Sequence, residues 1–340
     1  MKTISTIILV IFSILYFISS TLPANDDWPV LKGPYLGQKP PGMEPEIFAP
    51  GIISTGHSES HPFFTPDGKE LYYMLWGAPY NVILHMEEEK NGWTRPRIAP
   101  FFKKYDEKLC LTPDGKTIVF GSHRHRIGEG EERHKKPAPI WILKRTETGW
   151  SKAQKLRDPI NGPVAISGSG HLYFSTPFNG GIGGDDIFFS RYVNGDYAEP
   201  ENMGYSINTS LHECDPCISL DESFLIFCRK GEGFGRHDLF ISFRKDDDSW
   251  TKAINMGEPI NSSASELCPV FSPDGKYLFF TSNRRLHDPY SEIPLTYERK
   301  LKILNSPGSG SADIYWVDAK ILEDLKPEEL KKRRKDYENK

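Results

Sequence analysis

One short segment recurs along the chain, and this repetition restricts the possible folds more than any other feature. Residues 61–73, 108–120 and 268–280 share a Pro-Asp-Gly-Lys turn between apolar residues, and weaker copies lie at 163–174 and 216–227. The equivalent positions are separated by 47, 54, 53 and 53 residues and are Asp67, Asp114, Gly168, Asp221 and Asp274. A period near fifty residues indicates the blades of a β-propeller.

Each repeat can be divided into four short strands. The apolar residues on both sides of the turn predict an antiparallel hairpin, because Asp-Gly tolerates the positive φ of a tight turn. Third strands are predicted at 82–84, 140–143, 187–189, 239–241 and 314–317. A fourth strand is predicted to begin at an aromatic residue in four copies, namely Trp93, Trp150, Tyr197 and Trp250. In the last three copies it is predicted to run to a recurrent Ile-Asn segment, at 160–161, 207–208 and 260–261. The abundant turn residues, 29 Gly and 27 Pro, agree with an all-β fold.

The last repeat lacks a fourth strand after residues 314–317. Residues 45–54 resemble the fourth-strand segment 254–262, so we expect an N-terminal strand near 47–53 to complete the last blade and cover its edge. The prediction is an all-β protein with a single β-propeller of five four-stranded blades. Six blades remain the alternative if residues 25–44 contribute strands.

The N-terminus has the pattern of a secretory signal, with Lys2, an apolar run at 7–18 and small residues before Ala24. We expect residues 1–24 to be a signal peptide, 25–44 a linker, 45–320 the propeller and 321–340 a charged tail, helical after Pro327. An uncleaved anchor is the alternative, since the apolar run approaches the length of a membrane span. The predicted product is exported, periplasmic or secreted, monomeric, and without a membrane span after cleavage.

Composition excludes several classes of function. A net charge of −4 gives no general basic surface for nucleic acid, and five cysteines are too few for a disulfide framework in a chain of this size. The chain also lacks a nucleophile elbow, a P-loop, a zinc-protease motif and a Rossmann fingerprint. These absences favour a binding protein over an enzyme, and no cofactor other than Ca²⁺ is expected.

The repeat resembles a known family at three points. The Pro-Asp-Gly-Lys hairpin, the third strand that starts at Asp313-Ile-Tyr315 and the first strand with Glu266 and Pro269 resemble the WD-like repeat of TolB-like propellers in exported bacterial proteins. The resemblance covers about residues 45–320, although copies three and four lack Pro-Asp-Gly. It implies a propeller that binds a ligand or a protein of the cell envelope, such as an envelope protein or extracellular carbohydrate, and it implies no particular activity.

Acidic residues recur eight positions before the reference position in four copies: Glu59, Asp106, Glu213 and Glu266. Because first strands line the channel of a propeller, we expect these carboxylates at its mouth, where they would raise each other's pKa or recruit a cation. Two of them could act as the carboxylate pair of a glycosidase or polysaccharide lyase. The alternative is that each one is held by backbone groups or an arginine of its own loop.

A metal ion, if bound, is predicted at the channel mouth. The candidate ligands are Glu59, His61, Asp106, Glu213 and Glu266. Oxygen donors favour Ca²⁺, whereas His61 together with Cys268, its equivalent in the fifth copy, would suit Zn²⁺.

Two long loops, at 121–138 and 283–312, are predicted on the same face. Together with His61, their candidate ligand-binding residues are His123, Arg124, Arg126, Arg284 and Arg285. Arginine offers a bidentate fork to planar anions such as phosphate, sulfate or uronate. The alternative is a solvated run of charge.

Overall fold

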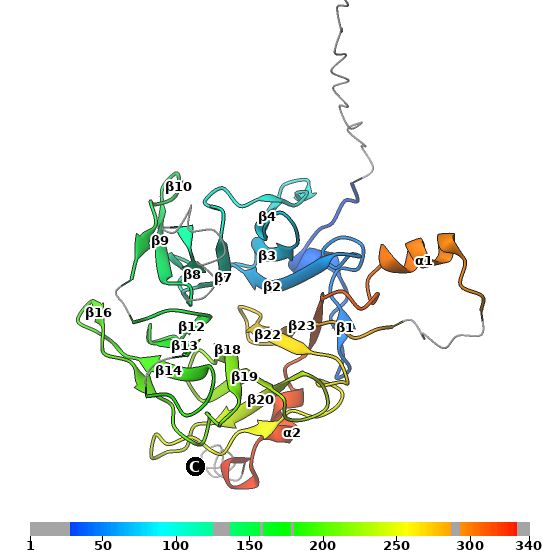
Figure 1. Ribbon diagram of the computed structural model, residues 1–340. Coiled ribbons are helices and arrows are strands. Elements are labelled where there is room, and N and C mark those ends of the chain that lie inside the picture. The colour runs from blue at the N-terminus through cyan, green and yellow to red at the C-terminus, as the bar shows by residue number, and fades with distance from the viewer. Residues whose placement is uncertain (1–27, 125–136, 157–158, 178–179, 287–292, 332–340) are drawn as a thin grey trace, which may run out of the picture. The chain divides into compact units, whose positions relative to one another are not determined.

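In the computed structural model the described residues are 28–124, 137–156, 159–177, 180–286 and 293–331. The chain divides into residues 1–30 and a unit formed by Leu31–Lys340. In the larger unit, five antiparallel sheets surround a common centre, with β2, β7, β12, β18 and β22 innermost (Figure 1). The predicted five-bladed propeller is confirmed for the part of the chain that the structure describes.

Each blade runs outward from its innermost strand in sequence order. Blade 1 contains β2 (Ser58–Phe64), β3 (Glu70–Trp76), β4 (Val82–Glu89), β5 (Gly92–Trp93) and β6 (Arg97–Ile98). Blade 2 contains β7 (Asp106–Leu111), β8 (Thr117–Ser122), β9 (Ile140–Thr146), β10 (Gly149–Trp150) and β11 (Gln154–Lys155). Blade 3 contains β12 (Val164–Ile166), β13 (Leu172–Thr176), β14 (Asp186–Ser190) and β17 (Glu201–Asn202), with a small hairpin of β15 (Tyr192–Val193) and β16 (Asp196–Tyr197). Blade 4 contains β18 (His212–Ile218), β19 (Phe224–Lys230), β20 (His237–Phe243) and β21 (Ile254–Asn255). Blade 5 contains β22 (Glu266–Phe271), β23 (Tyr277–Ser282), β24 (Asp313–Asp318) and β1 (Glu46–Ile47).

The predicted third strands all lie within strands of the structure, but the fourth strands begin later than predicted. Trp93, Trp150 and Tyr197 belong to short hairpin extensions beyond the third strand. The outer edge of these blades is formed by later segments, β6, β11 and β17. An aromatic residue therefore marks the hairpin before the edge strand and not the edge strand itself.

The N-terminal strand closes the ring as predicted. In β1, Glu46 is opposite Trp316 and Ile47 is opposite Tyr315 of β24. The amide of Phe48 continues the pairing with a 2.8 Å hydrogen bond to the Ile314 carbonyl. The strand is shorter than the expected 47–53, because the chain turns at Ala49. The Ala49 carbonyl accepts hydrogen bonds from the amides of Ile52 and Ile53, three and four residues later.

An aromatic cluster packs around the junction between β1 and β24, with residues from both the N-terminal segment and the last blade. Phe48 is fully buried and lies 5.2 Å from both Phe279 and Trp316 and 6.0 Å from Phe64, measured between ring centroids. Tyr35, in the 3₁₀ turn η1 (Pro34–Gly37), packs edge-on against Phe64 at 5.3 Å. The segment before the propeller is thus packed against the first and last blades.

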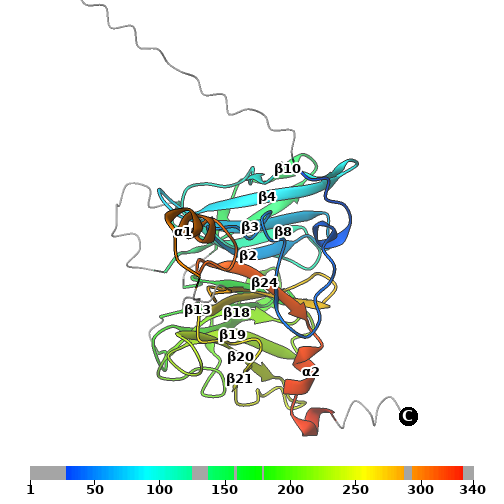
Figure 2. The same cartoon turned by 90° about the vertical axis from the view of Figure 1, so that its right-hand side faces the viewer.

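Two helices lie on opposite sides of the propeller (Figure 2). Helix α1 (Tyr297–Leu304) belongs to the connection between β23 and β24, whereas α2 (Ile321–Leu325) follows β24. A further helical turn begins after Pro327, where the sequence predicts one. Within the described residues, neither helix has the length and apolarity needed to cross a bilayer.

We predict that Phe48→Ala destabilises the fold by about 3–5 kcal/mol, because it empties the centre of the closing aromatic cluster. Phe234→Ala is the matched control, since Phe234 is 53% exposed. Urea unfolding of both variants measures the effect. Equal stability of the two variants would contradict the role given to the junction.

Candidate functional site

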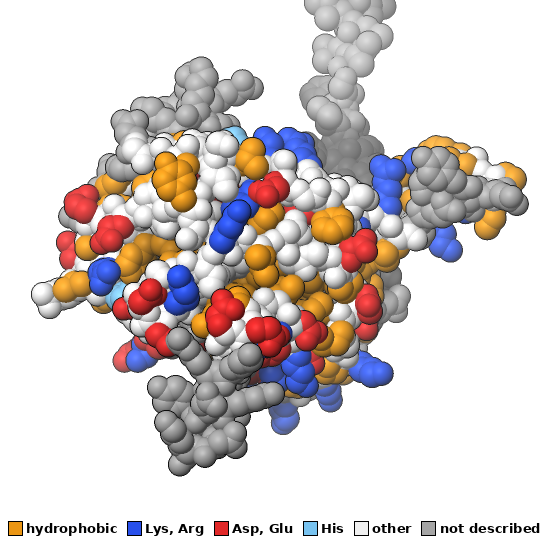
Figure 3. Space-filling view, turned by 90° about the horizontal axis from the view of Figure 1, so that it is seen from below, with side chains coloured by type: hydrophobic (Ala, Val, Ile, Leu, Met, Phe, Trp, Pro, Cys, Tyr) orange, Lys and Arg blue, Asp and Glu red, His pale blue; other side chains and the backbone are white. Residues whose placement is uncertain are grey.

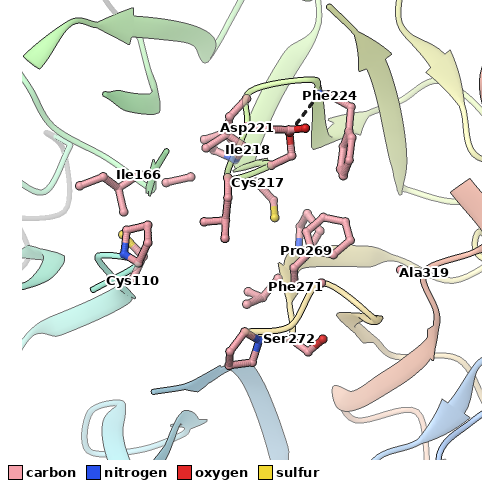
Figure 4. Close-up of a pocket in the computed structure, with 18 of the residues that line it drawn as sticks. Cys110, Ile166, Cys217, Ile218, Asp221, Phe224, Pro269, Phe271, Ser272 and Ala319 are labelled. Atoms are coloured by element: carbon pink, nitrogen blue, oxygen red, sulfur yellow. Dashed lines mark hydrogen bonds between the residues drawn. The ribbon is translucent and has the colours of Figure 1, made fainter. Parts of the chain in front are cut away.

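A cavity with a volume of about 1120 Å³ lies in the centre of the ring. Its wall is mainly apolar and comes from all five blades: Phe63 of blade 1 lines it, and Cys110, Ile166, Cys217 and Phe271 of the other four face a common space (Figure 4). It extends to the hairpin turns near Pro113 and Pro273 and to α2. The first strands therefore line the channel as the sequence predicts.

The inner strands of four blades carry the same irregularity. In β2, β7, β18 and β22 the register with the neighbouring strand shifts by a β-bulge. One residue of each bulge has a left-handed backbone: His61 (φ 50°), Lys108 (φ 49°), Asp215 (φ 49°) and Cys268 (φ 53°). This conformation costs a non-glycine residue about 1–2 kcal/mol, and bulges often re-aim side chains near functional sites.

The four bulge residues form one cluster that lines the cavity; we refer to it as the channel cluster. Lys108 Nζ donates to Asp215 Oδ1 at 2.8 Å, and the Cys268 thiol donates to Asp215 Oδ2 at 3.3 Å. One ring nitrogen of His61, one oxygen of Asp215 and Cys268 Sγ all lie within 4.8 Å of one another. His61, Asp215 and Cys268 are buried, and Lys108 is partly buried.

Electrostatics make the cluster an ion pair with two neutral neighbours. Burial by itself would raise the pKa of Asp215, but Lys108 and His61 lower it to about 2. Burial lowers the pKa of His61 to about 4, so its imidazole is neutral at pH 7. Burial opposes the charge on Lys108, yet Asp215 holds the pKa of this ammonium above its ordinary value. Burial also raises the pKa of the Cys268 thiol, so it keeps its proton.

Blade 3 contributes only a glycine at the equivalent position, Gly162 with φ 87°. A Cβ there would lie 2.0 Å from the Ser175 carbonyl oxygen, so no other residue fits without moving the backbone. The cluster consequently has four members in a ring of five blades.

The four predicted acids are not among the residues that line this cavity. Each one is at the start of an inner strand, is almost completely buried, and accepts hydrogen bonds within its own blade: Glu59, Asp106, Glu213 and Glu266. Glu59 accepts from the amide and hydroxyl of Thr55, and Glu213 accepts from the same two groups of Thr209. This geometry favours the alternative in which the acids anchor their loops.

Arginines complete three of these anchors. Arg124 binds Asp106, Arg229 binds Glu213 at 2.8 Å, and Arg284 binds Glu266 at 3.1 Å. Each guanidinium also lies over aromatic rings of its own blade, such as Phe240 at 4.3 Å from Arg229. Burial raises the pKa of Asp106 despite Arg124, and burial likewise raises the pKa of Glu59.

The predicted ligand-binding residues are divided by the structure. His61 lines the cavity, whereas Arg124 and Arg284 are engaged with Asp106 and Glu266. The remaining three are His123, which is buried, Arg285, which is exposed, and Arg126, which lies outside the described residues. The structure thus brings His61 and Cys268 together and leaves the loop cations apart from them.

Two members of the channel cluster, Lys108 and Asp215, are absent from the candidates derived from sequence. The signal that could have found them is positional, because all four residues stand six positions before the reference residue of their repeat. Because the residues at this position are as different as Lys, Asp and Cys, their equivalence becomes clear only from the shared bulge in the structure.

No protein-family model and no curated protein matches the chain. Among solved structures, it is similar to TolB from Acinetobacter baumannii (12% identity, 76% of this chain and 54% of that chain, TM-score 0.45). It is also similar to a putative TolB from Agrobacterium tumefaciens (14% identity, 76% and 90%, TM-score 0.46). A third similar structure is an α-L-arabinofuranosidase from Podospora anserina in complex with cellotriose (10% identity, 81% and 93%, TM-score 0.46).

The chain spans about half the length of the Acinetobacter TolB chain that it matches. These likenesses concern the fold alone, and the strand pairing described above establishes that fold independently. In the residues that the structure describes, the chain has the architecture of a five-bladed β-propeller.

We predict that Arg229→Met destabilises the protein by about 3–5 kcal/mol, because it leaves the buried Glu213 carboxylate without its cation. Adding Glu213→Gln should recover part of this loss, since a neutral amide needs no counterion. Arg191→Met is the matched control: Arg191 is exposed, lies 3.9 Å from Glu201, and should cost less than about 1 kcal/mol. Urea unfolding at pH 7 distinguishes them, and similar losses for Arg229→Met and Arg191→Met would argue against an anchoring role.

Asp313, the first residue of β24, gives a prediction for pH dependence. Burial raises its pKa to about 7, with the Gly308 amide opposing the shift and the nearby Glu59 carboxylate adding to it. A folded-state pKa above the ordinary 3.8 means that the fold favours the protonated acid. This stabilisation is complete below about pH 4 and is lost as the pH rises through 7.

We therefore expect the melting temperature of the native protein to rise relative to that of Asp313→Asn as the pH falls from 8 to 5. Glu201→Gln, at an exposed position, should show a constant difference from the native protein over the same range. A constant difference for Asp313→Asn as well would refute the assignment.

Proposed function

We propose that the protein is an exported binding module of the cell envelope whose central cavity holds an extended peptide segment of a partner protein. The single observation that carries this proposal is the 1120 Å³ cavity with its apolar wall and its polar channel cluster. Cavities of this kind are the usual places where proteins bind ligands, with a few polar groups fixing the orientation.

The chemistry of the wall supports a peptide over a carbohydrate. Ile166, Ile218, Phe224 and Phe271 offer aliphatic and aromatic surface that suits apolar side chains. Around the opening, charged residues of both signs could pair with polar backbone or side-chain groups: Asp221, Arg244, Asp274, Lys276 and Glu323. Carbohydrate is the alternative ligand class that the experiment below tests.

The surface supports a protein partner in a second way. On the face seen in Figure 3, acidic and basic side chains are interspersed, with apolar side chains exposed between them. A mixed surface of this type suits specific protein contacts better than binding to a polyanion such as nucleic acid. Export is proposed from the apolar run at 7–18, which lies outside the described residues.

An enzyme is less well supported by the same geometry. Glu59, Asp106, Glu213 and Glu266 are the acids on which a glycosidase or lyase assignment depends, and each is bonded within its own blade and outside the cavity lining. The channel cluster has one carboxylate, Asp215, which is paired with Lys108. A hydrolytic pair would need two carboxylates facing one space. At the opening of the cavity, Asp221 accepts from Ser223 and Asp274 accepts from Ser272 and the Lys276 amide, so these two carboxylates are held by their own turns.

The test is a screen of the purified protein against a displayed library of random peptides, with a panel of polysaccharides in parallel. We predict that selected peptides lose binding by tenfold or more in Leu220→Trp, because Leu220 lines the cavity and is 55% exposed, so a larger side chain obstructs the opening. Val193→Trp is the matched control on the β15–β16 hairpin, where the residue is also about half exposed.

Binding of peptides that Leu220→Trp weakens and Val193→Trp leaves unchanged would support the proposal. Binding of a polysaccharide with the same sensitivity would replace peptide by carbohydrate as the ligand class. Binding that ignores Leu220→Trp would move the site away from the cavity.

A further inference from the structure

The channel cluster brings three different metal-ligating side chains together from three blades. His61 comes from β2, Asp215 from β18 and Cys268 from β22, and their donor atoms lie within 4.8 Å of one another. Around a tetrahedral zinc ion, neighbouring ligand atoms are roughly 3.3–3.8 Å apart, given metal–ligand distances of about 2.0–2.3 Å. Asp215 and Cys268 already meet this spacing at 3.3 Å. The nitrogen of His61 lies within 4.8 Å of both, so it is the donor that has to move closer when an ion binds.

The donor set selects the class of metal. A thiolate and an imidazole are soft or borderline ligands that suit Zn²⁺ and related ions, whereas Ca²⁺ prefers six to eight oxygens. The oxygen-rich candidates, Glu59, Asp106, Glu213 and Glu266, are bonded in their own blades. Three protein ligands beside a cavity are also the arrangement of an open zinc site, in which a fourth position is left for another ligand.

The local structure holds these donors before any ion arrives. Each of the three residues has the left-handed backbone of its bulge, which directs its side chain to the channel. His61 Nδ1 is 3.0 Å from Ser60 Oγ, and Ser60 in turn accepts from the indole of Trp76. Such contacts behind a histidine fix the ring orientation that a metal requires.

Lys108 occupies the place of a counterion in the same cluster. Its ammonium is 2.8 Å from Asp215 and neutralises the carboxylate. With a divalent ion bound, the Cys268 thiolate and the Asp215 carboxylate balance the ion, and Lys108 leaves one positive charge in excess. Lys108 therefore competes with the metal, and the excess charge favours an anionic fourth ligand from the cavity.

We propose that the channel cluster is a binding site for a thiophilic divalent metal ion of the Zn²⁺ type, held by His61, Asp215 and Cys268. On binding, the Cys268 thiol releases its proton to solvent and the thiolate coordinates the ion. The fourth position faces the cavity that all three residues line. Lys108 is a built-in competitor that lowers the affinity. The site does not depend on which ligand, if any, occupies the cavity.

The test is a titration of the reduced, metal-free full-length protein with Co²⁺, which reports its ligands by absorption. We expect visible bands of tetrahedral Co²⁺, a near-ultraviolet thiolate-to-Co²⁺ band, and loss of both when Zn²⁺ is added, since the same site prefers Zn²⁺. Cys268→Ser should abolish the near-ultraviolet band. Cys110→Ser should retain it, although Cys110 lines the same cavity.

Lys108→Gln should strengthen metal binding, whereas Cys268→Ser should weaken it. A cluster with a purely structural role would not show this gain. Removing the competing charge while keeping a hydrogen-bond donor should tighten Co²⁺ binding by roughly tenfold or more. A melting curve establishes whether Lys108→Gln is folded. If this variant does not fold, the comparison of the native protein with the Cys268→Ser variant still tests the site.

Three outcomes would overturn the proposal. One is the absence of a thiolate band at millimolar Co²⁺ in both the native protein and folded Lys108→Gln. A second is a band that survives Cys268→Ser but disappears in Cys228→Ser, which would place the metal elsewhere. A third is stabilisation by millimolar Ca²⁺ without any response to Co²⁺, which would return the site to oxygen ligands.

Discussion

The pairing of β1 with β24 is the contact on which the rest of the molecule depends. Five sheets arranged in sequence leave one open edge, and only a strand from the other end of the chain can cover it. Two residues of ladder, Glu46 and Ile47, make that connection, and the aromatic packing around Phe48 supports it. Because the inner strands meet only when the ring is closed, the channel cluster is also a product of this junction.

Repeated polar residues hold the blades in register. Asn208 and Asn261, from the recurrent Ile-Asn segments, each bind the amide and the carbonyl of one residue in the third strand, Ile187 and Leu239 respectively. These side chains imitate a missing strand partner at a buried position, where an unpaired backbone group is costly. Asp186 and Asp238 likewise accept from backbone amides of the preceding loop. Repetition of a polar residue is therefore evidence of architecture here.

The sequence could predict the number of blades, the hairpins and the strand that closes the ring, because all three depend on a local pattern that recurs. The same pattern placed the start of the outer strands too early: Trp150 belongs to a hairpin extension, and the edge strand β11 follows it within the predicted segment. The acids were found by their spacing, but spacing does not show that Arg229 will turn toward Glu213. Lys108 and Asp215 were not predicted, because a β-bulge directs them to the channel and no residue type indicates such a bulge.

Gly162 gives the channel a property that a regular five-bladed ring would lack. With identical side chains at the five equivalent positions, a ligand on the axis could bind in five indistinguishable rotations. Here the positions are occupied by imidazole, ammonium, hydrogen, carboxylate and thiol in order around the ring, from His61, Lys108, Gly162, Asp215 and Cys268. A molecule entering along the axis therefore meets a surface with a single rotational register, and its orientation is specified by the protein.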